Sequence, residues 1–303
     1  MVVAESESEP RTRRRPLTRT LLASVAAAVF VAVHVAGGDL KVTHVLFAVV
    51  TVVAVFMLDR WRAVVLFALP FIVMTAAYDL QRFVGAKVTS MPVHVTALRT
   101  WELAWFGIHT PHGEITPAAW FQTHTLAVLD VVSALTYLGF VAAFLVMAVW
   151  WRFKEKRPEA QRVMWALLWL HLTGYLVHLL YPTAPPWYVD VYGDGPAVAD
   201  AAPDPAGLAR FDDLFDTSWF ANQYSTSSNT FGACPSLHVG QMFLAVLFAL
   251  RFRSLRTVAV TYWALVLFAS VYLNHHYIVD GLVGMVFAVG AYLLVHLPGR
   301  LRR

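Results

Sequence analysis

The stretch TLAVLDVVSALTYLGFVAAFLVMAVWW, residues 125–151, contains a single charged side chain, Asp130, and is otherwise largely apolar. A helix needs about 20 apolar residues to cross the hydrocarbon core of a bilayer, which is about 30 Å thick. Irregular backbone facing lipid would leave its polar groups without partners. The stretch therefore predicts a transmembrane helix rather than a strand or a loop.

Seven further apolar runs fall at 21–38, 43–58, 62–79, 163–182, 236–252, 257–274 and 277–297. The second of these is short, and Pro70 is expected to kink the third. The 303 residues are 58% hydrophobic and 14% charged, with a mean hydropathy of +0.59, whereas a soluble domain carries about 25% charged residues. This composition excludes most soluble enzymes, disordered chains and fibrous repeats. It predicts an all-α, polytopic integral membrane protein with about eight transmembrane helices.

The basic residues divide unequally between the two sides of this predicted bundle. Short cytoplasmic loops carry an excess of Lys and Arg, and one side holds 18 of the 23 basic residues: Arg11, Arg13, Arg14, Arg15, Arg19, Arg60, Arg62, Arg152, Lys154, Lys156, Arg157, Arg162, Arg251, Arg253, Arg256, Arg300, Arg302 and Arg303. We therefore expect a multi-pass protein of the cell membrane with an even number of spans and both termini cytoplasmic. The net charge of +4 and the pI near 9.3 then reflect topology and contact with anionic lipid, not nucleic-acid binding.

Thr12-Arg13-Arg14 resembles a twin-arginine signal, but no small-x-small cleavage site follows, so an uncleaved anchor is expected.

Two long loops lie on the predicted outer side, at roughly 80–124 and 183–235. The first contains aromatic residues suited to a segment lying at the lipid headgroups, namely Trp101, Trp105, Phe106, Trp120 and Phe121. The second is rich in Pro, Ala, Gly and Asp and is interpreted either as a mobile cover or as a connector.

Three motifs that are distant in sequence arrive together on the outer side. They are Tyr181–Trp187 (YPTAPPW), Cys234–His238 (CPSLH) and Asn274–Asp280 (NHHYIVD). Each lies at the outer end of a predicted span, so their convergence follows from the topology alone. Cys234 is the only cysteine, which excludes an intrachain disulfide and a Cys-rich metal site.

Two of these motifs carry histidines at predicted helix starts. Ser236 is a good N-cap, and the free N–H groups of the first turn make such a start an anion site; the alternative is an ordinary cap with an interfacial His238. His276 and Asp280 are four residues apart and share a helix face. A carboxylate there fixes the imidazole tautomer, as a nucleophilic or acid–base histidine requires, and an ionisable group within a span is usually functional. This pattern favours phosphoryl or phosphodiester transfer, in which one histidine attacks phosphorus and the other protonates the leaving oxygen.

The residues Ala184–Trp187, Phe231–His238 and Tyr272–Gly284 together resemble the fungal inositol phosphorylceramide synthases, within the type 2 phosphatidic acid phosphatase superfamily. The resemblance covers about 62–297 and implies a six-helix catalytic membrane domain there. Two extra N-terminal helices at 21–61 and basic cytoplasmic tails at 1–20 and 298–303 complete the expected organisation. The resemblance also implies that His276 is a nucleophile oriented by Asp280 and that His238 is the general acid and base. The donor would be a glycerophospholipid, by resemblance phosphatidylinositol, and the acceptor a lipid alcohol; no cofactor or metal is implied.

The chain departs from the general superfamily pattern in lacking the Lys-x6-Arg-Pro and Ser-Arg-x5-His cations that clamp phosphate. This departure favours a phosphodiester, which carries one negative charge, and the helix starts at Ser236 and near His275 are expected to bind it. Arg210 is the candidate cation, while Trp187 and Tyr188 are expected to line a lipid-facing mouth. The candidate substrate-binding residues are thus Ser236, His275, Tyr181, Trp187 and Arg210. With water as acceptor, the same residues would make a lipid phosphatase or phosphodiesterase.

The sequence offers three other interpretations of its function. Asp212-Asp213-Leu214-Phe215-Asp216 matches an Asp-Asp-x-x-Asp motif for magnesium diphosphate, but no second acidic helix accompanies it, and solvated loop charge is the simpler account. Paired histidines of a b-type cytochrome could come from His34, His44, His171 and His178. Haem would explain neither the helix start at Ser236 nor Asp280, and a Soret absorption band would test it. A transporter would favour broken spans, of which Pro70 gives the only sign.

Overall fold

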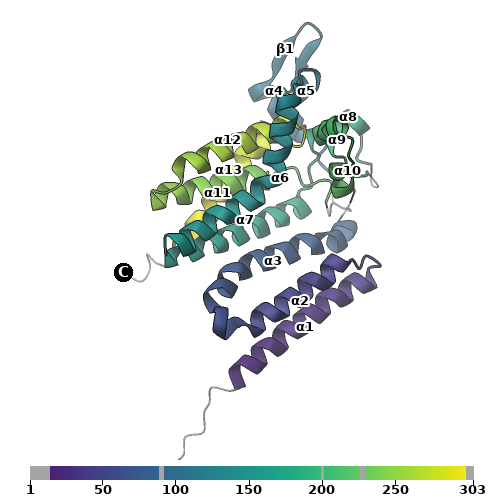
Figure 1. Cartoon of the computed structure of the whole chain (residues 1–303). Coiled ribbons are helices and arrows are strands. Elements are labelled where there is room, and N and C mark those ends of the chain that lie inside the picture. Colours follow the sequence, from purple (N-terminus) through teal and green to yellow (C-terminus); the bar gives the residue numbers. More distant parts are fainter. Residues whose placement is uncertain (1–13, 89–91, 199–200, 226–228, 298–303) are drawn as a thin grey trace, which may run out of the picture. The chain divides into compact units, whose positions relative to one another are not determined.

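The computed structural model describes residues 14–88, 92–198, 201–225 and 229–297, which are mainly helical (Figure 1). Residues 1–13 and 298–303, the greater part of the two predicted tails, lie outside these ranges. The chain divides into two compact units, Met1–Ile72 and Val73–Arg303. The division falls within helix α3 (Leu58–Val88).

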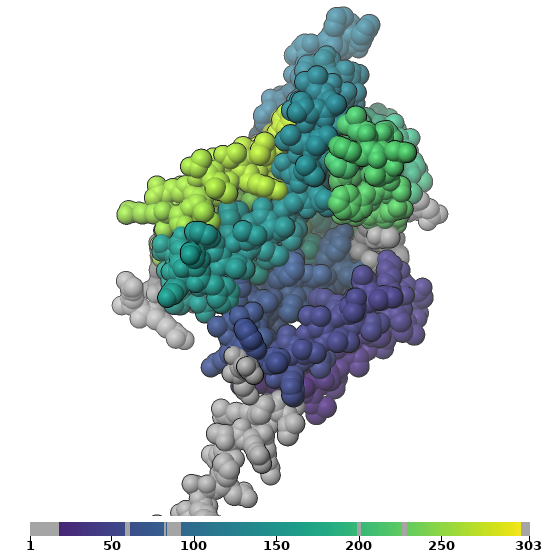
Figure 2. Space-filling model, viewed as in Figure 1, coloured from purple at the N-terminus to yellow at the C-terminus, as the bar shows by residue number. Residues whose placement is uncertain are grey.

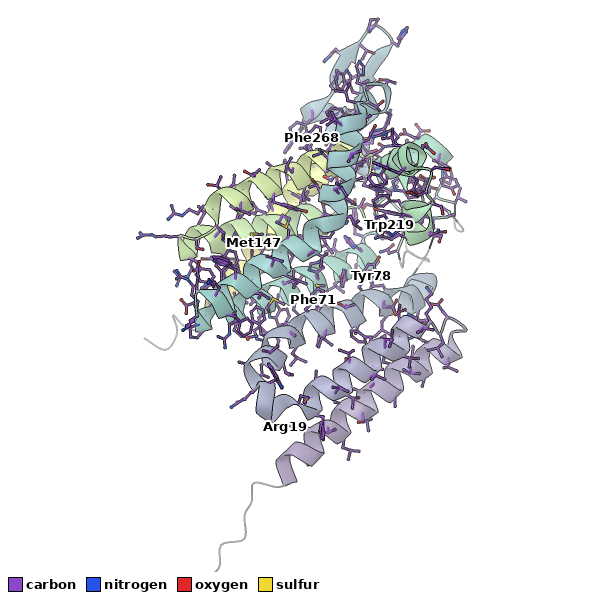
Figure 3. The ribbon with its side chains drawn as sticks, in the orientation of Figure 1. Arg19, Phe71, Tyr78, Met147, Trp219 and Phe268 are labelled. Atoms are coloured by element: carbon purple, nitrogen blue, oxygen red, sulfur yellow. The ribbon has the colours of Figure 1, made fainter. Side chains whose placement is uncertain are left out.

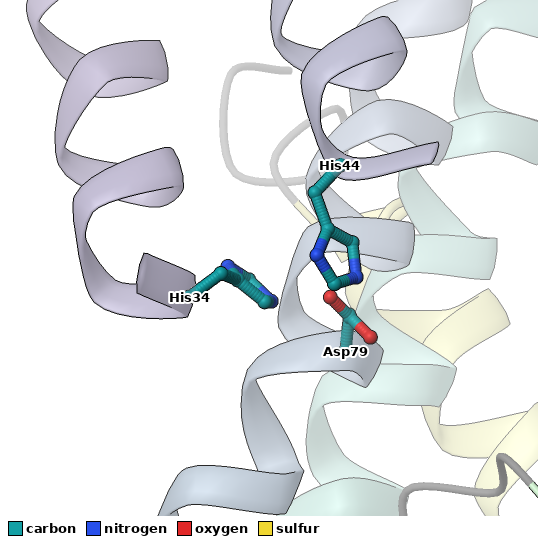
Figure 4. A group of neighbouring side chains, drawn as sticks. All are labelled: His34, His44 and Asp79. Atoms are coloured by element: carbon teal, nitrogen blue, oxygen red, sulfur yellow. The ribbon is translucent and has the colours of Figure 1, made fainter. Parts of the chain in front are cut away.

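The first unit contains a helical hairpin made of α1 (Arg14–Ala36) and α2 (Val42–Phe56). Its surface is rich in exposed apolar side chains, including Val29 and Val50 at 57% and 59%, as expected of helices that face lipid. Inside the hairpin the rings of His34 and His44 are in contact, with centroids 3.9 Å apart (Figure 4). The apolar exterior and polar interior agree with the predicted membrane hairpin.

Helix α3 contains Pro70 and also has an interruption in its helical dihedral angles near its start. Pro70 lies inside the helix, whereas the residue with non-helical dihedral angles is Trp61 (φ −116°, ψ 26°). Proline removes one backbone donor and can bend a helix without ending it. The break therefore belongs to the short connection between α2 and α3 rather than to the middle of a span.

The second unit is built around α6 (Ala127–Val149), α7 (Gln161–Leu180), α11 (Leu237–Phe252), α12 (Arg256–Tyr272) and α13 (Ile278–Leu294), which lie side by side in Figure 1. Helix α11 is central and packs against the other four. Buried apolar side chains fill the bundle along its length, and Met147 near the end of α6 is 3% exposed (Figure 3). The end at which α6, α11 and α13 begin is called the site end below.

Helices α11 and α13 approach each other closely because glycine stands at both contact points. A Cβ on Gly240 would meet the Gly284 carbonyl oxygen at 2.7 Å, and a Cβ on Gly284 would collide with the Ser236 carbonyl oxygen. The Ser236 N–H also donates to the Asp280 carbonyl oxygen at 2.9 Å. The starts of the two helices are thereby fixed against each other.

The described residues of the two long loops form short helices and a hairpin at the site end. The first forms α4 (Ala97–Phe106), the hairpin β1 (Ile108–Thr110) and β2 (Gly113–Ile115), and α5 (Pro117–Thr123). The antiparallel register of the hairpin pairs Ile108 with Ile115. On α4, Trp101 and Trp105 are 60% and 71% exposed, which agrees with the expected interfacial segment.

The second loop forms α8 (Pro186–Tyr192), a 3-10 turn (Ala206–Leu208), α9 (Ala209–Phe215) and α10 (Trp219–Tyr224). Leu208, Phe211 and Phe220 pack into one core cluster with residues of α6 and α12. In Figure 2 this green segment lies directly against α6, and in Figure 3 Trp219 marks its outer surface. The segment, including α8, is a packed cover rather than a bare connector, and we call it the cap.

Within the described ranges, four helices are long and apolar enough to cross a membrane: Thr18–Ala36, Trp61–Gln81, Ala127–Lys154 and Pro158–Leu180. Four more apolar helices are shorter, at Val42–Phe56, Leu237–Phe252, Arg256–Tyr272 and Ile278–Leu294. Every predicted apolar run is thus helical. Several long apolar helices of this kind are typical of a multi-pass membrane protein.

Candidate active site

The loop between α12 and α13 carries His276 into the interior of the site end. The N–H groups of His275 and His276 both donate to the Ser270 carbonyl oxygen at 3.0 Å, and Asn274 takes up a left-handed conformation (φ 63°) to make the turn. Helix α13 then begins with Tyr277 as its N-cap. This tight turn leaves His276 only 5% exposed, one helical turn before Asp280.

Asp280 holds the His276 ring by one of its nitrogen atoms. The Asp280 Oδ2 atom lies 3.0 Å from His276 Nδ1 and also accepts the Tyr277 N–H at 3.1 Å. Asp280 is completely buried, so its geometry is not disturbed by water. A carboxylate oxygen accepts hydrogen bonds, which puts the proton on His276 Nδ1 and leaves the lone pair on Nε2. The predicted His–Asp pair is thus formed.

His238 faces that lone pair from the first turn of α11. Its Nδ1 atom lies 3.2 Å from His276 Nε2. Ser236 caps the helix, its Oγ atom accepting the Val239 N–H at 3.5 Å, and the contact between α11 and α13 sets the spacing of the two rings. Two histidines and one aspartate from distant motifs therefore form one continuous chain of polar contacts.

Tyr137, in the middle of α6, is part of this site although it lies in no predicted motif. Its hydroxyl oxygen lies 3.2 Å from His238 Nδ1, and its ring stacks on His238 with centroids 4.4 Å apart. A tyrosine in an apolar span gives no sequence signal, because tyrosine is also common in ordinary helix packing. Its contact with His238 depends on how α6 and α11 pair.

His275 continues the stack on the other face of Tyr137. Its ring centroid lies 5.1 Å from Tyr137 and 4.9 Å from Tyr224 of the cap. Burial and, second, the neighbouring His276 lower the pKa of His275 to about 3, although a hydrogen bond to the Pro205 carbonyl acts in the opposite direction. His275 is therefore neutral at physiological pH, and its ring links Tyr224 of the cap to the loop between α12 and α13.

The structure places Arg210 in a network that anchors the cap. Its Nε atom donates to Asp130 Oδ1 at 2.6 Å, and its terminal nitrogen atoms donate to Gln122 Oε1 at 2.9 Å and to the Tyr272 carbonyl oxygen at 3.3 Å. The guanidinium group also lies 5.0 Å from the centre of the Tyr272 ring. The charge of the expected phosphate-binding cation is thus already paired with a buried carboxylate.

The motif at Tyr181–Trp187 contacts the loop between α12 and α13. The Trp187 backbone N–H donates to the Asn274 carbonyl oxygen at 3.1 Å. The side chains of Trp187 and Tyr188 are 5% and 1% exposed and pack in a core cluster of the cap, so they lie inside it and not at a lipid-facing mouth as expected. Tyr181 is 46% exposed and stacks on His94 at 3.7 Å.

Glu102 of α4 occupies the helix start that was expected near His275 as an anion site. Its two carboxylate oxygens accept the N–H groups of Ile278 and Val279, each at 3.0 Å. Those donors are the first N–H groups of α13 and have no partners within the helix. A protein carboxylate therefore fills this position, in place of a substrate phosphate. Nothing in the local sequence of α4 indicates the contact.

The other candidate ligands have structural partners. Asp212 receives the Phe220 and Ala221 N–H groups at 3.2 and 3.0 Å. Burial alone would raise the pKa of Asp212, but these hydrogen bonds outweigh it and lower the pKa. Asp212 thus holds the start of α10, so the first residue of the supposed magnesium motif is already engaged by backbone N–H groups.

The histidines considered for haem make hydrogen bonds close to their own helices. The His178 Nε2 atom lies 3.0 Å from the Pro235 carbonyl oxygen, which supports the entry to α11, and the His171 Nδ1 atom lies 3.0 Å from the Leu167 carbonyl oxygen. In the first unit, His34 Nδ1 contacts the Phe30 carbonyl oxygen, and His44 Nδ1 accepts the Lys41 N–H. At least one nitrogen of each ring is engaged locally.

Comparison with known proteins agrees with this geometry. The family described as PAP2 superfamily matches residues 105–294. The chain is 30% identical over 278 residues to the phosphoinositol dihydroceramide synthase of Bacteroides thetaiotaomicron, covering 90% of each chain. It is 34% identical over 170 residues to the inositol phosphorylceramide synthase catalytic subunit of Schizosaccharomyces pombe, covering 54% of this chain and 40% of that protein. The Candida albicans inositol phosphorylceramide synthase is 35% identical over 171 residues, 55% of this chain and 36% of that protein. No solved structure matches.

Proposed function

The chain belongs to the PAP2 superfamily, and from that premise we propose that it is a membrane phosphotransferase that moves a phosphoryl-alcohol headgroup from a glycerophospholipid to a lipid alcohol. The observation that carries the proposal is the polar chain from Asp280 through His276 to His238, with contacts of 3.0 and 3.2 Å. A nucleophile, the group that orients it and a proton donor stand in the order that two-step phosphoryl transfer needs.

In the first step the His276 Nε2 lone pair attacks phosphorus. The bond from phosphorus to the diacylglycerol oxygen breaks, and His238 gives that oxygen a proton, so diacylglycerol leaves as a neutral alcohol. Asp280 stabilises the positive charge that develops on the His276 ring. The product is a phosphohistidine that still carries the headgroup.

In the second step the roles of His238 reverse. Having lost its proton, it accepts one from the hydroxyl of the acceptor, whose oxygen attacks phosphorus. The bond between phosphorus and His276 Nε2 breaks, and both histidines return to their starting state. Proton and phosphoryl group balance without an additional reactant, because each proton that His238 gives in the first step is recovered in the second.

The names of the similar proteins guide the choice of substrates. The bacterial relative is a phosphoinositol dihydroceramide synthase and the fungal ones are inositol phosphorylceramide synthases. We infer phosphatidylinositol as donor and a ceramide-like lipid alcohol as acceptor. The acceptor hydroxyl would reach phosphorus beside His238, which is partly exposed, while His276 is 5% exposed.

The proposed topology has eight spans, with both termini cytoplasmic and the site end on the extracytoplasmic face of the cell membrane. Its support is the sidedness of the basic residues together with eight apolar helices, four of them short. A helix of 15 to 17 residues such as α2 or α13 spans about 23–26 Å at a rise of about 1.5 Å per residue. Such helices suit a site that sits slightly below the membrane surface.

The test incubates the purified protein in detergent with phosphatidylinositol labelled in its headgroup and with a ceramide. We expect a labelled lipid product and an acid-labile phosphohistidine, both lost in His276→Ala, and loss of product in His238→Ala. Full turnover by either variant would refute the mechanism. Release of the label only as free inositol phosphate, even with acceptor present, would instead identify a hydrolase that uses the same residues.

A further inference from the structure

Helix α4 has one exposed face and one buried face. Trp101 and Trp105 are 60% and 71% exposed, whereas Leu98 and Glu102 are 6% and 0% exposed. Leu98 packs with Tyr277 and Val279 at the start of α13, and Glu102, four residues later, lies on the same face of the helix. A fully buried glutamate on a short surface helix requires a specific partner, because burying a charge without one is costly.

The partner is the backbone of the catalytic helix. The Glu102 Oε1 and Oε2 atoms each receive one N–H, from Ile278 and Val279, at 3.0 Å. The next residue is Asp280, whose Oδ2 atom lies 3.0 Å from His276 Nδ1. Glu102 therefore binds the first turn of α13, from which the Asp280 carboxylate projects. This contact, which uses both Glu102 oxygens, is called the grip below.

We propose that Glu102 is a positioning residue for phosphoryl transfer, holding the first turn of α13 and thereby Asp280 against His276. This inference rests on the proposed function for its effect on turnover. Glu102 does not reach the reacting atoms itself. It orients Asp280, which in turn orients His276. Loss of a supporting contact of this kind typically lowers activity about 10- to 100-fold.

The grip also depends on the ionisation of Glu102. Burial raises the pKa of Glu102 to about 7, the two backbone hydrogen bonds oppose this rise, and the charge of Asp280 adds to it. Tyr277 at the N-cap also feels the Glu102 charge, and Arg99 on α4 lies close enough to act on Tyr277 as well. Protonation turns one acceptor oxygen into a hydroxyl donor, which faces an N–H donor. The grip therefore weakens as the pH falls through about 7.

The first experiment compares turnover of the wild type with that of Glu102→Gln and Glu102→Asp in detergent or vesicles. Glu114→Gln is the matched control, because Glu114 is an exposed glutamate in the hairpin next to α4. In Glu102→Gln the amide NH2 group faces a backbone donor, so we expect kcat to fall about tenfold or more with KM changed less than about twofold. Glu102→Asp keeps the charge and should recover part of the rate. The control should behave as wild type.

The second readout is the pH profile of kcat. The wild type should lose activity as the pH falls through about 7, where Glu102 takes up its proton. In Glu102→Gln this acid limb of the profile, the fall of kcat at low pH, should move to lower pH, where only the catalytic histidines titrate. A contact that served only folding would lower the thermal stability without moving the limb. An unchanged limb, or an unchanged kcat, overturns the proposal.

Hydrogen–deuterium exchange in the peptide around Ile278 and Val279 separates this inference from the proposed function, because it needs no substrate. Exchange there should be faster in Glu102→Gln than in the wild type or in Glu114→Gln, and faster in the wild type below pH 7 after correction for intrinsic rates. Unchanged exchange overturns the grip, even in an active enzyme. If the wild type transfers no headgroup but exchange responds as expected, the proposed function fails while the grip on α13 is supported.

Discussion

Removing the Tyr137 hydroxyl should slow turnover by a modest and definite factor. In Tyr137→Phe the ring that stacks on His238 and His275 is kept, and the hydroxyl loses its contact with His238 Nδ1, at 3.2 Å, and its hydrogen bond with Tyr224. The variant thus separates the polar contact from the stacking. We expect His238 to be held less well in the orientation that faces His276.

The size of the effect follows from the kind of hydrogen bond. The contact joins a hydroxyl group to a ring nitrogen at the long end of the usual range of separations, so it is worth about 1 kcal/mol. Because about 1.4 kcal/mol corresponds to a tenfold change in rate, kcat should fall about fivefold. KM should stay nearly constant, since Tyr137 is proposed to support the acid–base group and not to bind lipid.

The assay measures transfer of labelled inositol phosphate to a ceramide at saturating donor. Tyr262→Phe is the matched control, because its hydroxyl donates to the Thr136 carbonyl oxygen at 3.1 Å, away from the histidines but beside the same helix. Both variants should lose similar stability, and only Tyr137→Phe should lose rate. A fall of more than about 100-fold would mean that Tyr137 itself transfers a proton. An unchanged kcat would show that the contact has no role in the reaction.

Two further changes test the core of the site. Asp280→Asn keeps the shape but presents an amide to His276 Nδ1, so kcat should fall about 10³-fold or more through loss of the correct tautomer; transfer at near the wild-type rate would refute its orienting role. Gly284→Ala places a Cβ against the Ser236 carbonyl oxygen and should cost about 1–3 kcal/mol of stability and much of the activity, as measured by thermal unfolding and turnover. Gly290→Ala on the same helix, where a Cβ meets no atom within 4 Å, should be neutral, and equal effects of both would contradict the close approach of α11 and α13.

The position of the helices could be read from the sequence because composition leaves few alternatives. Runs such as 125–151 have no polar surface to offer water, and lipid forces their backbone into helices. The non-helical residue Trp61, near the start of α3, carries no local signal, and the kink expected at Pro70 stays a prediction. Helix α13, at 17 residues, is shorter than its apolar run at 277–297, because Tyr277 is its N-cap and the helix ends at Leu294, before the last three residues of the run.

The residues that we propose as catalytic were predictable for a related reason. His238, His276 and Asp280 lie at the starts of spans, and topology brings those starts to the same end of the bundle. The expected contact between His276 and Asp280 is formed, but not across a shared helix face, because His276 lies in the loop before Tyr277, the N-cap of α13. Their order along the polar chain followed from the family resemblance.

The supporting residues could not be found in the same way. Glu102 lies 176 residues before Ile278 in sequence, and Tyr137 lies 101 residues before His238. Such contacts depend on the packing of whole helices, which no local pattern encodes. Arg210 is the candidate cation because it lies in the second outer loop, and no local pattern links it to its partner Asp130, on another helix 80 residues away.

The same packing bears on the choice between transfer and hydrolysis. The cap is held by Arg210 on Asp130 and by Asp212 at the start of α10, and it brings Tyr224 onto His275 beside the nucleophile. A phosphohistidine that formed under this cap would meet little water, because His276 is 5% exposed, and exclusion of water protects reactive intermediates from hydrolysis. His238, which is proposed to activate the acceptor, is in contrast partly exposed. The enclosure therefore favours a lipid alcohol over water as the group that resolves the intermediate.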